Sequence, residues 1–141
     1  MKVGIDIHNC IDLYPDFFRQ LSMSLVVSGN EIHVITGQEW DKVKHKVEQA
    51  GIVITHHFSI VDFHKESGTK MWLNNKGTWE MDKDIWEKSK GIYAHQNLID
   101  IHFDDSVDYV KWFPKSCTYI VVPKTNFHIF SEWILKGLLA K

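Results

Sequence analysis

Several residues that could act together on a phosphate group each follow a short apolar run. Asp6 comes near the end of the run KVGIDI, Thr36 ends the run EIHVIT, and Asp104 and Asp105 follow the run DIHF. Carboxylates that share one crevice repel each other unless a cation compensates their charge, and hard oxygen ligands beside a phosphate favour Mg²⁺. A hydroxyl such as that of Thr36 and a nearby lysine would complete a site for a dianionic phosphoryl group. The sequence therefore predicts a phosphate and Mg²⁺ site, provided that the fold brings these run ends together.

The first half of the chain alternates strand-like with helix-like segments. Apolar runs predict strands over Lys2–Ile7, Glu31–Thr36 and Ile52–Ile54, and helical periodicity predicts helices over Asp16–Ser28 and Glu39–Ala50. This alternation is typical of an α/β fold in which helices cover a parallel sheet. Ligands of such sheets bind beyond the carboxyl ends of the strands, where the polar residues would converge. We therefore expect an α/β fold with a mainly parallel sheet.

The second half is predicted to continue the sheet after a small insertion. Turn-forming pairs such as Gly68-Thr69 and Asn74-Asn75 predict a β-hairpin insertion over about Phe58–Trp79. After it, the pattern predicts helices over Asp84–Gln96, Ser106–Trp112 and Ser131–Ala140, and strands over Asp100–Phe103 and Thr118–Val122.

Length and composition indicate one globular domain. The chain has 141 residues, of which 44% are hydrophobic and 24% charged, and its formal net charge is -2 at pH 7. This length suits a single domain over residues 1–141. A nearly balanced charge gives no electrostatic footprint for duplex nucleic acid or an anionic membrane surface, and no apolar run approaches the roughly 18 residues of a membrane span. Asp6 interrupts the apolar start too early for a signal peptide, so a cytoplasmic location is expected.

The cysteine and aromatic content indicates which kinds of site and surface the protein could have. Cys10 and Cys117 are far apart, which offers neither a disulfide framework nor a Cys-x-x-Cys metal knuckle. Aromatic residues reach 13%, with six Trp, which favours a flat binding surface or an interface between subunits. A C-terminal apolar stripe would either cover the sheet or pair with another subunit in a homo-oligomer; it consists of Phe130, Trp133, Ile134 and Leu138.

The order of the polar residues resembles the motifs of the haloacid dehalogenase-like superfamily, most of whose members transfer phosphoryl groups. The first family motif, an apolar strand followed by Asp-x-Asp-x-Thr/Val, is similar to Val3–Ile11 (VGIDIHNCI). The second, a strand ending in Thr or Ser, is similar to His33–Gly37, and the fourth, a strand ending in paired acids, to Ile101–Ser106. The third motif is a lysine before those acids, for which Lys90 is the first candidate and Lys88 the alternative. The resemblance implies a three-layer Rossmann-like core.

The resemblance also implies a role for each matching residue. Asp6 would attack phosphorus in line and form an aspartyl-phosphate. Thr36 would hydrogen-bond the phosphoryl group beside Gly37, and Lys90 would balance the charge on the nucleophile and the phosphate. These roles make Thr36, Gly37 and Lys90 candidate substrate contacts.

One position departs from the family pattern. Family phosphatases place an Asp two residues after the nucleophile to protonate the leaving oxygen and then activate water, whereas this chain has His8. Such acid–base help is worth about 10²–10⁴-fold, and an imidazole with a pKa near 6.5 can in principle supply it. In the family, Mg²⁺ is held by the nucleophile, the backbone carbonyl at the position of His8 and the paired acids. Here the implied ligands are Asp6, His8, and Asp104 or Asp105.

Two functions follow from this departure. The first is a Mg²⁺-dependent phosphohydrolase that acts on a small phosphate ester, with a nucleotide as the leading candidate. The alternative is a catalytically impaired protein that binds and sequesters a nucleotide or another phosphorylated small molecule. The two differ in whether position 8 can move a proton.

Aromatic and histidine side chains near the predicted insertion are further candidates. Trp72, Trp79 and Trp86 have the flat surfaces on which a nucleobase stacks, although packing against the sheet is the simpler role for any one of them. We take Trp72 and His64 as candidate substrate contacts.

Three histidines in this region raise the question of zinc. His56, His57 and His64 have no cysteine near them, and their spacing matches no closed four-ligand pattern. We expect these residues to cap a strand or to line the rim of the pocket.

Overall fold

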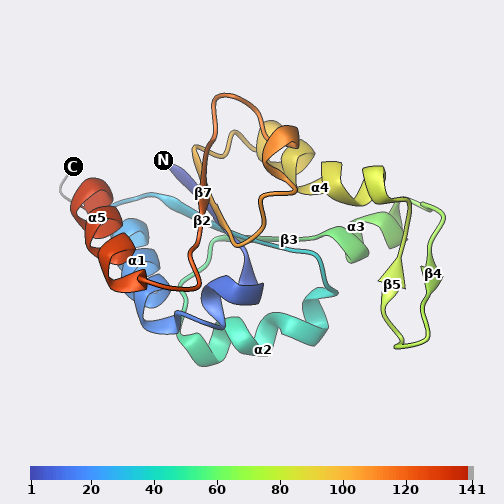
Figure 1. The fold of residues 1–141 in the computed structure, drawn as a ribbon, viewed down its shortest axis with the longest axis horizontal. Coiled ribbons are helices and arrows are strands. Elements are labelled where there is room, and N and C mark those ends of the chain that lie inside the picture. The colour runs from blue at the N-terminus through green and yellow to red at the C-terminus, as the bar shows by residue number, and fades with distance from the viewer. Residues whose placement is uncertain (140–141) are drawn as a thin grey trace.

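A five-stranded parallel sheet forms the centre of the structure, a computed structural model that describes residues 1–139 (Figure 1). Its strands lie in the order β3-β2-β1-β6-β7, and each neighbouring pair is parallel. The order of succession reverses between β1 and β6, so the crevice beyond their carboxyl ends is where ligands of such sheets bind. The strands are β1 (Lys2–Ile5), β2 (Glu31–Thr36), β3 (His56–Ser59), β6 (Ile101–Asp104) and β7 (Thr118–Val121).

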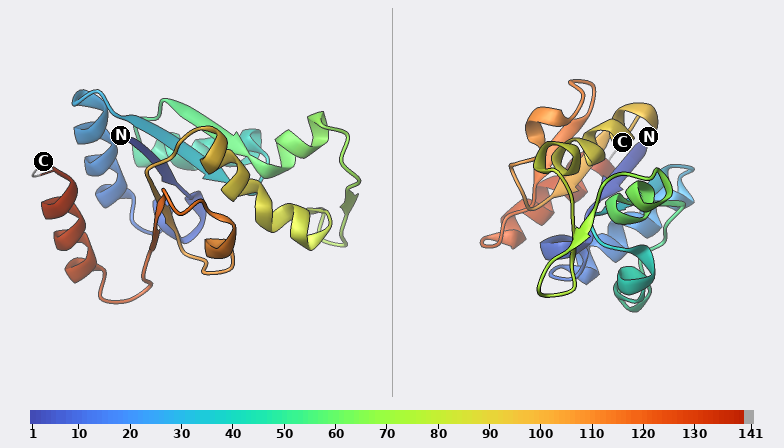
Figure 2. Two further views of the ribbon diagram at one scale, coloured as in Figure 1. Left: turned by 90° about the horizontal axis from the view of Figure 1, so that it is seen from above. Right: turned by 90° about the vertical axis from the view of Figure 1, so that its right-hand side faces the viewer.

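Helices cover both faces of this sheet and make three layers, as expected for a Rossmann-like α/β fold (Figures 1 and 2). The helices are α1 (Pro15–Val27), α2 (Trp40–Ala50), α3 (Ile60–Glu66), α4 (Lys83–Gln96) and α5 (Phe127–Leu139). On one face, α1, α2 and α5 enclose the larger core, and Figure 2 shows α1 and α5 side by side. On the other face, α4 packs on a smaller core around Ile35, Ala94 and Ile99.

Local signals explain where several helices begin and end. Pro15 occupies the first turn of α1, and Gly51 ends α2 in the left-handed conformation with φ of 70°. Ser59 and Asp82 cap α3 and α4, because their side chains accept backbone N–H groups of the first turn. Within residues 1–139, no helix has both the length and the apolar character needed to cross a membrane.

The predicted strand over Ile52–Ile54 is wrong, because pairing with β2 begins only after it. Ile52 instead packs into the core, and the Thr55 N–H donates to the Ile32 carbonyl just before β3 starts. The strand itself, His56–Ser59, lies at the edge of the sheet and has a polar sequence. Its histidines are exposed, so it lacks the apolar run that marks a buried strand.

The predicted insertion over Phe58–Trp79 is only partly a hairpin. Its first part completes β3 and forms α3, where Ile60, Val61 and His64 are buried on one helical stripe. The hairpin is confined to β4 (Trp72–Leu73) and β5 (Trp79–Glu80), which pair antiparallel and project away from the main sheet (Figure 1).

The last two predicted helices also have different bounds. Over Ser106–Trp112 the structure has only a 3₁₀ turn, η2 (Val110–Trp112). Side-chain bonds shape the start of this segment as a loop: Asp104 accepts the Ser106 N–H, and Ser106 accepts the Asp108 N–H. Helix α5 begins earlier than predicted, and the expected end at Ala140 lies outside the described residues.

The C-terminal apolar stripe covers the sheet with three of its four residues. Phe130, Ile134 and Leu138 pack against the larger core, whereas Trp133 is 77% exposed.

Candidate active site

A cavity of about 310 Å³ lies beyond the carboxyl ends of β1, β2 and β6. It is therefore at the point where the strand order reverses. Asp6, Thr36 and Asp105 line it from the three strand ends, as the sequence predicts, and Lys90 reaches it from α4. Gly37 and His8 also line the cavity.

At the base of the cavity, Lys90 lies between two aspartates. Its Nζ donates to Asp104 Oδ2 at 2.7 Å and lies 3.2 Å from Asp6 Oδ1. Side chains alternate along a strand, so Asp6 and Asp104 both extend from the face of the sheet that α4 covers. All three side chains are buried. Of the two candidate lysines, Lys90 is therefore the one beside these acids, and the Lys88 ammonium lies over the ring of Trp112.

Burial and charge set the protonation of this group. Burial raises the pKa of Asp6 to about 6, although the Lys90 ammonium opposes the shift. Asp104 is buried as well, but Lys90 and the bond from His102 outweigh this effect and hold the pKa of Asp104 well below its usual range. For Lys90, burial alone would lower the pKa, yet its attraction to Asp6 and Asp104 raises the pKa above the ordinary lysine value. Lys90 and Asp104 are therefore charged, and Asp6 ionises close to neutral pH.

Close packing of α4 against the loop before β7 brings Lys90 to this position. A Cβ at Gly91 would lie 2.2 Å from the Trp112 carbonyl oxygen, so a larger residue would push the helix away. From the same loop, the Tyr109 ring lies 4.8 Å from Lys90 Nζ. Glycine at position 91 thus lets α4 approach closely enough to bury the neighbouring lysine.

Trp86 and Tyr109 form an aromatic wall on one side of the cavity. The Trp86 Nε1–H donates to Tyr109 Oη at 3.1 Å, and both residues line the cavity. Gly37, at the end of β2, lies directly against this wall, and a Cβ at Gly37 would lie 2.7 Å from the Trp86 ring. Glycine at position 37 therefore allows the indole to sit directly against the end of β2.

The two acids after β6 have different surroundings. Asp104 is fully buried: its Oδ2 contacts Lys90 and His102, and its Oδ1 accepts the Ser106 N–H at 3.0 Å. Asp105 lines the cavity, and its Oδ2 accepts a hydrogen bond from Asn9 Nδ2 at 2.8 Å. Asp105 is therefore the acid of this pair that faces the cavity.

The aspartates suit a hard divalent cation. One carboxylate oxygen from each of Asp6, Asp104 and Asp105 lies within 4.8 Å of the others. Within residues 1–139, Lys90 is the one lysine whose ammonium contacts these acids, so negative charge is in excess when all three acids are ionised. Carboxylate oxygens this close together are suitable ligands for Mg²⁺, which keeps several bound waters and needs few protein ligands.

Thr36 lies deep in the cavity, whereas His8 lies at its rim. Thr36 is buried, and its Oγ1 accepts the Gln38 N–H at 3.4 Å, which leaves its own O–H to donate to a ligand. The His8 side chain is 73% exposed at the rim, where its Nδ1 lies 3.7 Å from Asp12 Oδ2. Lys46 of α2 approaches the same Asp12 oxygen at 3.6 Å and places an ammonium at the rim.

Two predicted substrate contacts lie outside this cavity. His64 is held between α3 and α4, where its ring nitrogens contact Thr69 Oγ1 at 2.7 Å and Ser89 Oγ at 2.8 Å. Trp72 lies on the hairpin and donates to Glu80 Oε2. Neither side chain is brought together with Asp6.

Sequence reasoning missed two residues that line the cavity, Lys46 and Tyr109, and a third, Asn9, that holds one of its acids. Asn9 adjoins the first motif, but only the fold shows that it holds Asp105. Lys46 gave no motif signal, and Tyr109 lies in the segment predicted as helix.

Comparison of the sequence with protein-family models and with curated proteins gives no match. Membership of the haloacid dehalogenase-like superfamily thus stays a prediction from the motifs.

Proposed function

We propose that this protein is a Mg²⁺-dependent phosphohydrolase of the haloacid dehalogenase type, which acts on a small phosphate ester. The observation that carries the proposal is the position of Lys90 between Asp6 and Asp104 beneath a cavity at the switch point of the sheet. A buried lysine there neutralises the nucleophile and the incoming phosphate together.

The chain's own residues supply a two-step displacement. The Asp6 carboxylate forms a bond to phosphorus while the bond from phosphorus to the ester oxygen breaks. The leaving oxygen takes a proton from the His8 imidazolium, and Thr36 and Lys90 donate hydrogen bonds to the phosphoryl oxygens. Neutral His8 then takes a proton from water as its oxygen attacks phosphorus. Inorganic phosphate leaves, and the Asp6 carboxylate and protonated His8 are restored.

Asp6 and Asp105 are the side chains that would hold Mg²⁺, with Asp104 behind them. When bound, the ion would neutralise charge on the carboxylates and on the phosphoryl oxygens. Asn9 positions Asp105 for this role through its hydrogen bond to Oδ2. Lys90 keeps Asp104 ionised beneath the site.

The aromatic wall supports a nucleotide as the leading substrate candidate. Trp86 and Tyr109 line the cavity above Lys90, so the leaving group of a bound ester would contact a flat apolar surface. Stacking of a base on an aromatic side chain is worth about 1–3 kcal/mol.

The exposure of His8 favours the second candidate, a protein that binds a phosphorylated small molecule without turnover. Its ring lies at the rim beside Asp12 and has no contact that fixes it toward Asp6 among the described residues. An unfixed side chain is a poor proton donor for a leaving group.

Phosphate release from a panel of nucleotides and sugar phosphates, with Mg²⁺, tests the proposal. Wild type should release phosphate, Asp6→Asn should not, and the exposed control Asp41→Asn should match wild type. Equal release by Asp6→Asn refutes the phosphohydrolase. Binding without release by wild type, together with release by His8→Asp, identifies the sequestering protein instead.

A further inference from the structure

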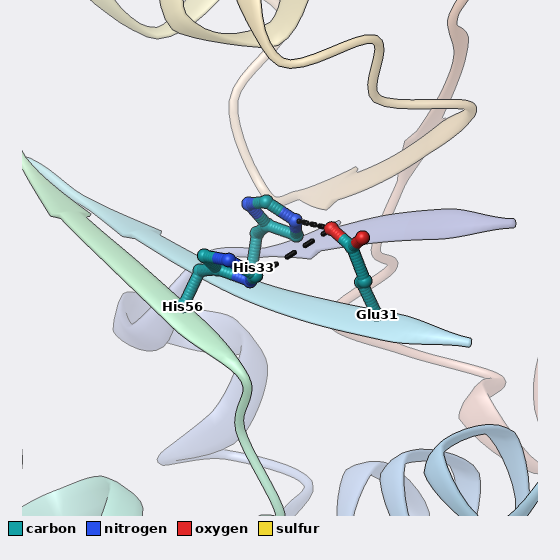
Figure 3. Close-up of side chains that lie close together, drawn as sticks. All are labelled: Glu31, His33 and His56. Carbon is teal, nitrogen blue, oxygen red and sulfur yellow. Dashed lines mark hydrogen bonds and ion pairs between the residues drawn. The ribbon is translucent and has the colours of Figure 1, made fainter. Parts of the chain in front are cut away.

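A second group of metal-ligating side chains lies at the amino ends of β2 and β3 (Figure 3). Glu31 and His33 are two residues apart on β2, so both extend from the same face of the sheet. His56 on β3 is the register partner of His33, which places the two rings next to each other. This group lies at the opposite end of the strands from the cavity that contains Asp6.

The three side chains converge on one point. His33 Nε2 lies 2.8 Å from Glu31 Oε2, and His56 Nδ1 lies 3.8 Å from the same oxygen. One ligand atom from each residue lies within 4.8 Å of the others. The imidazoles are stacked, with centroids 4.3 Å apart and planes 11° apart. Figure 3 shows both rings turned toward the Glu31 carboxylate.

A hydrogen bond from α4 fixes the orientation of the buried ring. His33 is 1% exposed, and its Nδ1 contacts Tyr93 Oη at 2.8 Å. Without an ion, the Nε2–H of His33 donates to the Glu31 carboxylate, which can only accept, so a metal ion has to displace this proton. The Tyr93 hydroxyl can then accept from Nδ1–H, which leaves the lone pair of Nε2 pointing at the group. Metal-binding histidines commonly have their second nitrogen held in this way.

The other two side chains are accessible to solvent. The side chains of Glu31 and His56 are 38% and 51% exposed, and β3 is an edge strand. An ion would have to compete with Lys2, whose Nζ lies 3.6 Å from Glu31 Oε2, and with the hydrogen bond between His56 Nδ1 and Thr55. Both contacts are exposed, so exchanging them for a metal costs little.

We propose that Glu31, His33 and His56 form a second metal site, which takes a divalent transition-metal ion such as Zn²⁺ and leaves its remaining coordination to water. Two imidazoles and one carboxylate suit Zn²⁺, whereas Mg²⁺ prefers oxygen ligands alone. The bound ion joins the edge strand β3 to β2. This site is independent of the phosphohydrolase activity proposed for the opposite end of the sheet.

Zn²⁺ titration by calorimetry tests the site, with millimolar Mg²⁺ present to occupy the active-site carboxylates. Wild type should bind one Zn²⁺, and Glu31→Gln and His56→Ala should each weaken it at least about 10-fold. His57→Ala is the matched control, because His57 is adjacent but extends from the other face and stacks on Trp40. It should bind as wild type does. Circular dichroism checks that each variant is folded.

Co²⁺ gives a second readout, because imidazole coordination produces visible absorption bands that carboxylates and water alone produce weakly. These bands should appear in wild type and Asp105→Asn, and be lost in His56→Ala. Absence of Zn²⁺ binding to wild type would overturn the proposal. Loss of binding in Asp105→Asn with retention in His56→Ala would also overturn it, since the ion would then occupy the active-site carboxylates.

Discussion

The Lys90 ammonium lies 3.2 Å from Asp6 Oδ1, between the end of the first strand and the helix that covers it. Both side chains are buried, so their charges interact through protein rather than through water. Asp104, 2.7 Å from the same ammonium, takes the stronger share of this interaction. Asp6 is left as a buried carboxylate whose charge is only partly compensated, which is consistent with its proposed role as the nucleophile.

Removing the charge of Asp6 should stabilise the metal-free protein above pH 6. The folded-state pKa of Asp6, about 6, exceeds its ordinary value of 3.8. Its contribution to stability is therefore complete below pH 3.8 and lost as pH rises through 6. At pH 8, Asp6→Asn should be more stable than wild type by roughly 1–3 kcal/mol. Urea unfolding in EDTA at pH 4 and pH 8 measures this, and a variant that is less stable at pH 8 contradicts it.

Replacing Lys90 with an apolar residue should strongly destabilise the protein. Lys90→Met leaves Asp6 and Asp104 buried without their cation, which should cost about 3–5 kcal/mol at pH 7. Lys88→Met is the matched control on the same helix, and loss of its contact with Trp112 should cost under about 1 kcal/mol. Urea unfolding measures the free energy of unfolding of both variants. Equal losses would show that Lys90 does not neutralise these acids.

The role of His8 in proton transfer should be visible in kcat alone. His8→Ala should lower kcat by about 10²-fold or more. Because the His8 side chain is exposed at the rim, stability and substrate affinity should change little. His95→Ala, an exposed histidine of α4, provides the control. Steady-state kinetics with unchanged kcat in His8→Ala would assign the proton transfers to another group.

The two acids after β6 should respond differently to substitution. Asp105→Asn should weaken Mg²⁺ binding about 10–100-fold with the fold intact, because Asp105 faces the cavity. Asp104→Asn should destabilise the protein, because Lys90 and His102 both lose a charged partner. Calorimetric titration with Mg²⁺ and urea unfolding separate the effects. Full Mg²⁺ affinity in Asp105→Asn would remove that residue from the site.

Sequence patterns predicted the part of the fold that carries the acids. Helices cover both faces of the strands that end near Asp6, Thr36 and Asp104. The sequence of each strand is therefore an apolar run that ends at a polar residue. The edge strand His56–Ser59 has no such run, because its first two side chains, His56 and His57, are exposed. This strand is identified only by its pairing with β2 in the structure.

Residues whose roles depend on contacts between distant parts of the chain could not be predicted from the sequence. The bond from Asn9 to Asp105 depends on how β1 and β6 lie next to each other. By position in the sequence, His56 groups with His57 and His64. Alternation along the strand sends His57 to the other face, and His64 lies on α3, so the partner of His56 is His33.

Detection of a phosphoryl group on Asp6 tests the proposed function most directly. Acid quenching during turnover, followed by pepsin cleavage at low pH and mass spectrometry, examines the peptide that contains Asp6, because an aspartyl-phosphate is stable in acid and hydrolyses at the pH that trypsin needs. With the best substrate and Mg²⁺, wild type should carry one phosphoryl group on this peptide, located at Asp6 by fragmentation. Asp6→Asn should carry none. Rapid phosphate release by wild type, with this peptide unmodified at every quench time, would contradict the aspartyl-phosphate mechanism.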